Sequence, residues 1–342
     1  MMIQSNEPKT TARNSEASSS QSQILLAQDL RKSYGPRLAL RGLSFSLKAG
    51  RVLGFLGPNG AGKTTAIRIL TTILEPSSGH FFVDGISSEY PERIRPKIGV
   101  LPESLGLPKQ ITGIEYLTYF GQLYGRTATE ARTVGLALLK EVGLQQRANS
   151  LIGTYSHGMR QRLGIARALV NDPVVVFLDE PTLGLDPRGQ QELLALVRRI
   201  ARERNSGVVL CSHLLSEIEG VCDDVVILNL GQVVAAGSVA EVLGQAERNV
   251  IQIRVPSSSI AKAQQVLEAI PNVKQATPTD EMTGRLAVEL ADSADGTSSE
   301  EPLVKNRILE ALIHAEIPVL SFGFAGSRLQ DLFLQVTDEA IS

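Results

Sequence analysis

One stretch of nine residues constrains the fold of this chain more than any other. Residues 57–65 read Gly-Pro-Asn-Gly-Ala-Gly-Lys-Thr-Thr and fit the phosphate-binding pattern G-x-x-x-x-G-K-S/T. A strand-like apolar run (51–56) precedes this loop, and a helix-like run (66–74) follows it. Because such a loop works only between a strand and a helix, the stretch predicts an α/β fold with a site for nucleotide phosphates.

The residues of this loop have separable expected roles. Glycine lets the backbone turn so that successive N–H groups point at an anion. We expect Lys63 to reach the β- and γ-phosphates and the Thr64 hydroxyl to ligate Mg²⁺. The predicted phosphate-binding set is Gly57, Pro58, Asn59, Gly60, Ala61, Gly62, Lys63, Thr64 and Thr65. A glycine turn that only happens to precede a helix is the alternative, and the lysine and threonines count against it.

Length and composition exclude several classes of protein. The chain has 342 residues, 43% of them hydrophobic, which is enough for two domains with ordinary cores. A net charge of −2 gives no general attraction to nucleic acid or anionic lipid. Cys211 and Cys222 lack metal-ligand spacing and predict reduced thiols. No apolar run approaches the roughly 18 residues that span a bilayer, and residues 1–23 lack the apolar part of a signal peptide. We therefore expect a soluble chain inside the cell.

Hydrophobic patterning divides the chain into three parts. Residues 1–23 are polar and predict a disordered tail. In residues 24–244, apolar runs such as 174–178 alternate with helical periodicity, as in a buried parallel sheet, and residues 104–170 predict a helical subdomain. Residues 245–342 show the order strand, helix, strand, strand, helix, strand, with a last helix at 329–336. This order predicts a small α+β ferredoxin-like domain.

Two carboxylates form a second candidate site element. Asp179 and Glu180 follow the apolar run 174–178, so we expect them at the carboxyl edge of the sheet, where ligands of open α/β sheets bind. Asp179 suits Mg²⁺, and Glu180 suits a general base that orients an attacking water. A strand that ends in two acids is weak evidence by itself. Together with the loop at Gly57 it predicts a site that hydrolyses the bound nucleotide.

A third element is the start of the helix that leads into residues 163–170. Ser156 and Gly158 lie at this start, where a hydroxyl and free N–H groups face outward. Alone, the pattern indicates a helix N-cap and no more.

These elements occur in one fixed order: the loop, the segment Tyr155-Ser156-His157-Gly158-Met159, the strand to Glu180, Gly184-Leu185-Asp186 and His213. In that order they resemble the ATP-binding cassette (ABC) ATPases over about residues 24–244. The segment at Ser156 is similar to the YSxGM variant of the LSGGQ signature, seen in ATPase subunits of multidrug, antibiotic and polysaccharide exporters. The C-terminal part looks like an accessory domain common in that branch. The resemblance implies a P-loop NTPase core, ATP and Mg²⁺ as ligands, and ATP hydrolysis coupled to transport.

The resemblance assigns further residues. Tyr34 matches the aromatic that stacks on adenine, and a buried packing tyrosine is the alternative. Asp186 matches the residue that couples the halves of the ATPase dimer, and a plain turn or N-cap is the alternative. His213 matches the histidine that contacts the γ-phosphate and follows a predicted strand, although a lone histidine is more often structural. The predicted catalytic residues are therefore Glu180, His213 and Lys63.

Two residues depart from the family pattern. Glu103 stands where the family usually has a glutamine that touches Mg²⁺ and senses the transport partner; it adds a charge and removes an amide donor. The exporter branch often carries Glu there, so we expect coupling to the transport partner to survive. The predicted metal ligands are Thr64, Glu103 and Asp179. His157 replaces a signature glycine, which puts close backbone approach at that residue in doubt but not the Ser156 contact.

The resemblance also implies partners. Ser156 and Gly158 would complete the ATP site of a second subunit in a head-to-tail dimer, and the filled catalytic positions favour a homodimer. A transmembrane permease is expected on a separate polypeptide, with this chain at the cytoplasmic face of the plasma (inner) membrane and no nucleic acid partner. One alternative is a soluble cassette ATPase that remodels ribosomes or nucleic acid. Another is a non-hydrolysing module that uses ATP only as a dimer switch.

Overall fold

A computed structural model describes residues 23–212, 214–246, 250–271, 273–280, 282–290 and 301–324. The predicted tail, except Gln23, and the predicted last helix (329–336) lie outside the described residues, and so does His213.

A central sheet of six strands carries the fold, in the order β10-β9-β3-β8-β7-β6. Its strands are β3 (Val52–Leu56), β6 (Ile98–Leu101), β7 (Val175–Asp179), β8 (Gly207–Cys211) and β9 (Asp224–Asn229), all parallel, and β10 (Gln232–Ser238), antiparallel to β9. Strand β3 shows why the apolar runs are continuous: Val52 and Leu56 face one core, and Leu53 and Phe55 face the other. The predicted parallel sheet is confirmed.

A second, antiparallel sheet packs against one face of the first, in the order β2-β1-β4-β5. It consists of β1 (Gln23–Tyr34), β2 (Arg37–Lys48), β4 (Ser78–Val83) and β5 (Ile86–Ser87). Its residues Leu25, Leu40 and Phe81 share a core with Phe55 of the central sheet. Sequence patterning predicted alternating strands and helices over residues 24–244 but no separate antiparallel sheet, because pairs such as Leu25 with Val83 join residues far apart in the chain.

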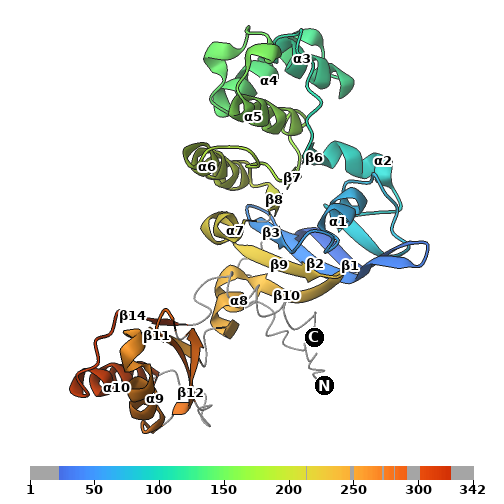
Figure 1. Ribbon diagram of the computed structural model, residues 1–342. Coiled ribbons are helices and arrows are strands. Elements are labelled where there is room, and N and C mark those ends of the chain that lie inside the picture. The colour runs from blue at the N-terminus through green and yellow to red at the C-terminus, as the bar shows by residue number, and fades with distance from the viewer. Residues whose placement is uncertain are drawn as a thin grey trace, which may run out of the picture.

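Helices cover the sheets, and some of them form a group of their own. Those close to the sheets are α1 (Lys63–Leu70), α2 (Pro91–Ile94), α6 (Pro187–Arg204), α7 (Leu215–Val221) and α8 (Val239–Ala246). The remaining helices up to α8, namely α3 (Gly113–Leu123), α4 (Ala128–Glu141) and α5 (His157–Ala168), form a group drawn in green at one end of Figure 1. Within this group α5 also contacts β6, because the Arg167 guanidinium donates to the Val100 carbonyl (2.7 Å). Short 3-10 turns occur at Arg95–Lys97, Gln145–Arg147, Ile152–Thr154 and Ser257–Ser259. Capping boxes begin α3 (Thr112 with Glu115) and α4 (Thr127 with Glu130), which fixes where both helices start.

The C-terminal part has its own sheet and core. Its elements are β11 (Val250–Arg254), α9 (Ile260–Glu268), β12 (Val273–Asp280), β13 (Arg285–Leu290), α10 (Glu301–His314) and β14 (Ser321–Phe324). The sheet is antiparallel with the order β12-β13-β11-β14, and Ile251, Leu267 and Leu312 lie in the core. This is the predicted ferredoxin-like order of elements. The domain boundary near residue 244 stays a prediction, since α8 continues to Ala246.

Two expectations from composition can be compared with the described residues. None of the helices in the described ranges is both long and apolar enough to cross a membrane. Cys211 and Cys222 are buried, free thiols, as expected for reduced cysteines.

Candidate functional site

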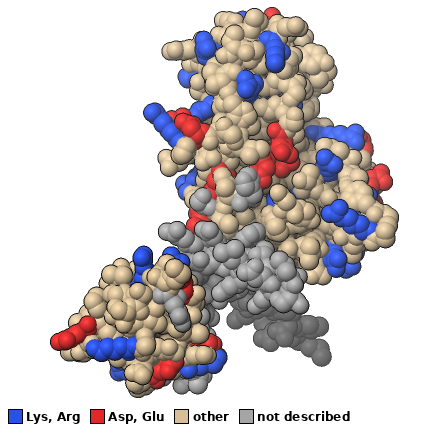
Figure 2. All heavy atoms as spheres, viewed as in Figure 1, with Lys and Arg blue, Asp and Glu red and all other residues tan. Residues whose placement is uncertain are grey.

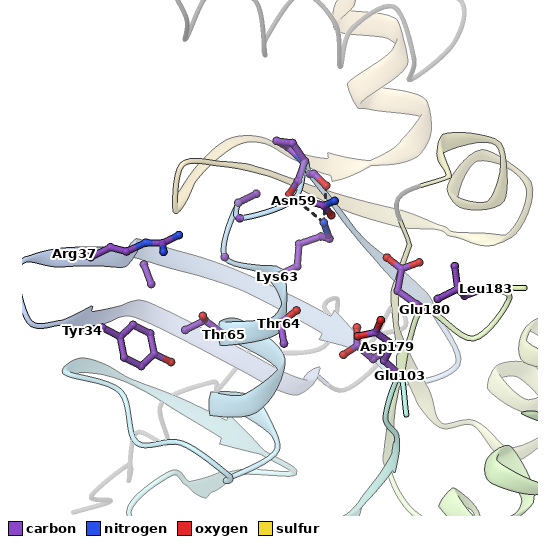
Figure 3. A pocket seen from close by; sticks show the side chains of 16 residues that line it. Tyr34, Arg37, Asn59, Lys63, Thr64, Thr65, Glu103, Asp179, Glu180 and Leu183 are labelled. Atoms are coloured by element: carbon purple, nitrogen blue, oxygen red, sulfur yellow. Dashed lines mark hydrogen bonds between the residues drawn. The ribbon is translucent and has the colours of Figure 1, made fainter. Parts of the chain in front are cut away.

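A cavity of about 690 Å³ lies at the carboxyl edge of the central sheet (Figure 3). Its size lies within the roughly 300–1,000 Å³ of small-molecule sites. Its lining residues are Tyr34, Arg37, Ala39, the whole loop Gly57, Pro58, Asn59, Gly60, Ala61, Gly62, Lys63, Thr64 and Thr65, then Glu103, Asp179, Glu180 and Leu183. The parallel strands β3, β6 and β7 all end at this edge, which brings together residues from three distant parts of the sequence.

The loop between β3 and α1 is shaped by its glycines. A Cβ on Gly57 would lie 2.3 Å from the Leu228 carbonyl oxygen, and one on Gly62 would lie 2.8 Å from that of Ala39. Gly62 also has φ +108°, a conformation that other residues rarely adopt. The loop therefore runs against neighbouring backbone, where only glycine fits.

The side chain of Lys63 folds back into this loop. Its ammonium group donates hydrogen bonds to the carbonyl oxygens of Gly57 (2.5 Å) and Pro58 (3.2 Å), and the residue is only 9% exposed. Lys63 is also the first residue of α1, whose N-terminus has no side-chain cap. A buried ammonium and an uncapped helix N-terminus together make a strong site for an anion such as a phosphate.

Three carboxylates converge on the other side of the cavity. Asp179 ends β7, Glu180 follows it, and Glu103 follows β6. Burial raises the pKa of Asp179, and the negative charges of Glu103 and Glu180 raise it further, whereas Lys63 and Arg68 oppose the shift. Figure 2 shows acidic side chains gathered in the middle of the visible face, between the helical group α3–α5 and the part of the molecule that contains α1 and α2.

The donor set fits Mg²⁺. Carboxylate oxygens and the Thr64 hydroxyl are the hard ligands that this ion prefers, and the like charges around Asp179 would be offset by a cation. Within the described ranges no cluster of three or more His, Cys, Asp or Glu residues could hold a metal by itself. That agrees with an ion that takes one or two carboxylates and completes its shell with phosphate oxygens and water.

Glu180 has an unusual backbone. Its φ of +49° lies in the left-handed region, which is costly for a residue with a side chain. Its N–H donates to the Cys211 carbonyl (3.0 Å), and its own carbonyl accepts from the Leu183 N–H (3.2 Å). These bonds hold the turn in place, and the carboxylate points toward the cavity (Figure 3).

The hairpin between β1 and β2 forms the remaining wall. Tyr34 is 46% exposed and lines the cavity, so the alternative of a buried packing tyrosine is wrong. Arg37 pairs with Tyr34 across the hairpin, and its guanidinium lies 4.0 Å from where a Cβ on Gly60 would be. Sequence patterning did not single out Arg37, Ala39 or Leu183. A hairpin signal at Gly35 could have placed Arg37 beside Tyr34.

Ser156 and Gly158 do not line this cavity. Ser156 is exposed and caps α5, its hydroxyl accepting from the Met159 N–H (3.2 Å), which confirms the predicted helix start. Asp186 caps α6 in the same way through Gly189 (3.0 Å), the local role considered as its alternative. A role of Asp186 between subunits stays a prediction, and so does the role of His213.

Replacing Asp179 with Asn should separate stability from metal binding. The raised pKa means that the folded protein holds this proton more tightly than the unfolded chain, so the ionised carboxylate destabilises the fold above the ordinary pKa of 3.8. We expect the variant without nucleotide to melt a few degrees higher at pH 7, with no gain near pH 3. ATP should stabilise both proteins through the phosphate loop, but adding Mg²⁺ to ATP should stabilise the wild type further and the variant much less. Thermal unfolding against pH measures both effects, and a variant that gains as much Mg²⁺-dependent stability as the wild type would contradict the metal role.

Comparison with known proteins agrees with this geometry. Residues 40–183 match the family described as "ABC transporter". The chain is 33% identical over 319 residues to the linearmycin resistance ATP-binding protein of Bacillus subtilis, covering 93% of this chain and 99% of that protein. It is 34% identical over 313 residues to the daunorubicin/doxorubicin resistance ATP-binding protein of Streptomyces peucetius, covering 90% of each.

Solved structures give the same result for the cassette part. An ATP-binding subunit of an ABC transporter superposes with a TM-score of 0.58 at 31% identity, covering 65% of this chain and 92% of that one. A dimeric ATP-binding cassette in a post-hydrolysis state, bound to ADP and phosphate, gives a TM-score of 0.58 at 25% identity, over 63% and 99% of the two chains. With relatives of at least 30% identity aligned over nearly their full length, this chain belongs to the ABC transporter family, as one of its ATP-binding ATPase subunits.

Proposed function

We propose that this chain energises an export transporter by binding and hydrolysing ATP, with the membrane-spanning permease on a separate polypeptide. The observation that carries the proposal is the cavity itself, which places an anion-binding loop opposite three carboxylates. The names of the relatives add the direction of transport, because they include two drug-resistance proteins and a Nod factor export ATP-binding protein, which is 36% identical over 221 residues. The chain would then act at the cytoplasmic face of the membrane, attached through the permease.

We assign the residues of the cavity as follows. Tyr34 would stack on the adenine, and the loop from Gly57 to Thr65 would enclose the phosphates with Lys63 at its centre. Thr64, Glu103 and Asp179 would hold Mg²⁺, which offsets phosphate charge when bound. Glu180 would orient the attacking water and accept its proton, while His213 would contact the γ-phosphate.

A second subunit would complete each site. Ser156 and Gly158 lie outside the chain's own cavity although they belong to the signature segment, and Ser156 is exposed. This placement supports a head-to-tail homodimer in which each Ser156 segment meets the ATP of the partner. Two ATP molecules would then be buried between the subunits, so that binding closes the dimer and hydrolysis opens it.

Mixing two inactive variants tests this arrangement. Ser156→Arg keeps the phosphate loop and blocks the signature segment, whereas Lys63→Ala does the reverse. In a head-to-tail dimer, a mixed pair regains one intact site, so phosphate release from the mixture should rise well above that of either variant alone. As a control, a chain with both substitutions should inhibit the wild type. A mixture that stays inactive while the doubly substituted chain leaves the wild type unaffected would contradict the dimer.

Co-purification tests the transport role. The tagged chain should retain a polytopic membrane protein encoded beside it, and its ATPase rate should change when that protein is present in lipid. An ATPase that associates only with ribosomes or nucleic acid would contradict the role in export.

A further inference from the structure

The imidazole of His157 joins the start of helix α5 to the loop that follows β7. His157 is the first residue of α5, and its Nε2 lies 2.8 Å from the carbonyl oxygen of Leu183. A carbonyl oxygen can only accept, so Nε2 must carry the hydrogen. Leu183 belongs to the loop between β7 and α6, which begins at Glu180.

The two ends of this hydrogen bond lie next to residues with distinct proposed tasks. On one side, His157 directly follows Ser156, which is exposed and outside the chain's own cavity. On the other side, Leu183 lines that cavity, and its N–H donates to the Glu180 carbonyl (3.2 Å). One side chain therefore links the segment proposed to meet the partner's ATP to the turn that carries the general base.

The surrounding groups are shaped to fit this contact. Gly184 has φ +76°, and a Cβ there would lie 3.4 Å from Nε2, so a side chain at position 184 would crowd the imidazole. Next to it, a Cβ on Gly158 would lie 3.5 Å from Leu185 Cδ2, in ordinary contact. The start of α5 and the loop thus pack together at two adjacent places.

The loop itself is held as one unit. The Leu185 N–H donates to the Thr182 carbonyl (3.1 Å), and the Asp186 carboxylate caps α6. Thr182 is 1% exposed. Because the loop is fixed internally, a displacement of α5 acting through the imidazole would move the loop as a whole, together with the turn at Glu180.

We propose that His157 is a positioning residue that couples the two ATP sites of the dimer. When the Ser156 segment closes on the partner's ATP, the bond from His157 to Leu183 would set the turn of Glu180 in the chain's own site. The proposal rests on the head-to-tail dimer of the proposed function. His157 itself does not line the nucleotide cavity, so it acts through Leu183 and not on the substrate.

Three substitutions test the bond. In His157→Gln the amide nitrogen reaches the position of Nε2, in His157→Asn it reaches only that of Nδ1, and His157→Gly restores the residue usual in the family. The Asn and Gly variants should lose about tenfold in kcat, the size expected for one lost hydrogen bond. Their Hill coefficient for ATP should fall toward one. The kcat of the Gln variant should stay within about twofold of the wild-type value, because its hydrogen bond to Leu183 is kept.

Two controls identify a merely structural effect. The Kd for ATP with Mg²⁺ under monomeric conditions, measured by calorimetry, should be the same in all four proteins, as should cooperative thermal unfolding. If the His157→Gly substitution unfolds the helix start, the comparison of the Gln variant with the Asn variant alone decides.

The outcomes separate the inference from the proposed dimer. If the Asn and Gln variants behave alike, or if kcat and the Hill coefficient are unchanged in both the Asn and Gly variants, the coupling role of His157 is wrong while the dimer stands. If the wild type shows no cooperativity and mixing Ser156→Arg with Lys63→Ala restores nothing, the dimer itself is wrong.

Discussion

Replacing Glu180 with Gln should lower phosphate release by about 10²–10⁴-fold, the usual contribution of a general base. The amide keeps the size of the side chain but cannot accept the proton of the attacking water. ATP binding should persist, because the phosphate loop and Lys63 are unchanged. We therefore expect ATP-bound dimers to accumulate, visible by size-exclusion chromatography with ATP.

The control for this variant is an exposed carboxylate outside the cavity. Glu75→Gln removes one negative charge from the end of the turn after α1 and should leave turnover unchanged. Normal turnover in Glu180→Gln would show that another group accepts the proton. The backbone cost of the left-handed conformation at position 180 is the same for Glu and Gln. Gln also removes a negative charge that repels Asp179, so the variant should be at least as stable as the wild type.

Replacing Lys63 with Ala should weaken ATP binding by roughly a hundredfold or more, as expected when about two charge-assisted hydrogen bonds to phosphate are lost. The ammonium group also closes the loop through the carbonyl groups of Gly57 and Pro58, so its removal leaves the loop less ordered for the ligand. Isothermal titration calorimetry with ATP and Mg²⁺ measures the change in Kd directly.

Lys97→Ala is the matched control for charge. Lys97 is a surface lysine paired with Asp84 (2.9 Å), and it does not line the cavity. Its loss should leave the Kd unchanged, which separates contact with phosphate from a general effect of net charge. An unchanged Kd in Lys63→Ala would contradict the assignment of the loop as a phosphate site.

Features encoded by neighbouring residues could be predicted well. The loop at Gly57 and the pair Asp179–Glu180 were found because each depends on a short segment and the element beside it. The helix start at Ser156 and the order of elements in the C-terminal sheet were found for the same reason. Periodicity reports which face of an element is buried, and turn residues report where it ends.

Features that depend on pairing between distant segments were not found. The antiparallel sheet of β1, β2, β4 and β5 requires residues such as Leu25 and Val83 to meet, and nothing local specifies that pairing. Arg37 joins the cavity only because β1 and β2 pair, and Leu183 only because the loop after β7 bends back toward the sheet edge. The hydrogen bond of His157 could not be predicted for the same reason, because its partner Leu183 is 26 residues away in sequence.

The sequence by itself determined that this chain has a phosphate-binding loop on an α/β core. It also determined that two carboxylates, Asp179 and Glu180, follow a buried strand that ends near this loop. These properties follow from local chemistry, because the loop needs only its own glycines and lysine, and the buried strand needs only its own run of apolar residues. Only the tertiary structure decided that Glu103, in the segment after β6, raises the pKa of Asp179 at the end of β7, and that Ser156 lies outside the chain's own cavity. Electrostatic and packing contacts act through space, so their partners emerge only when the sheet brings separate strands to one edge.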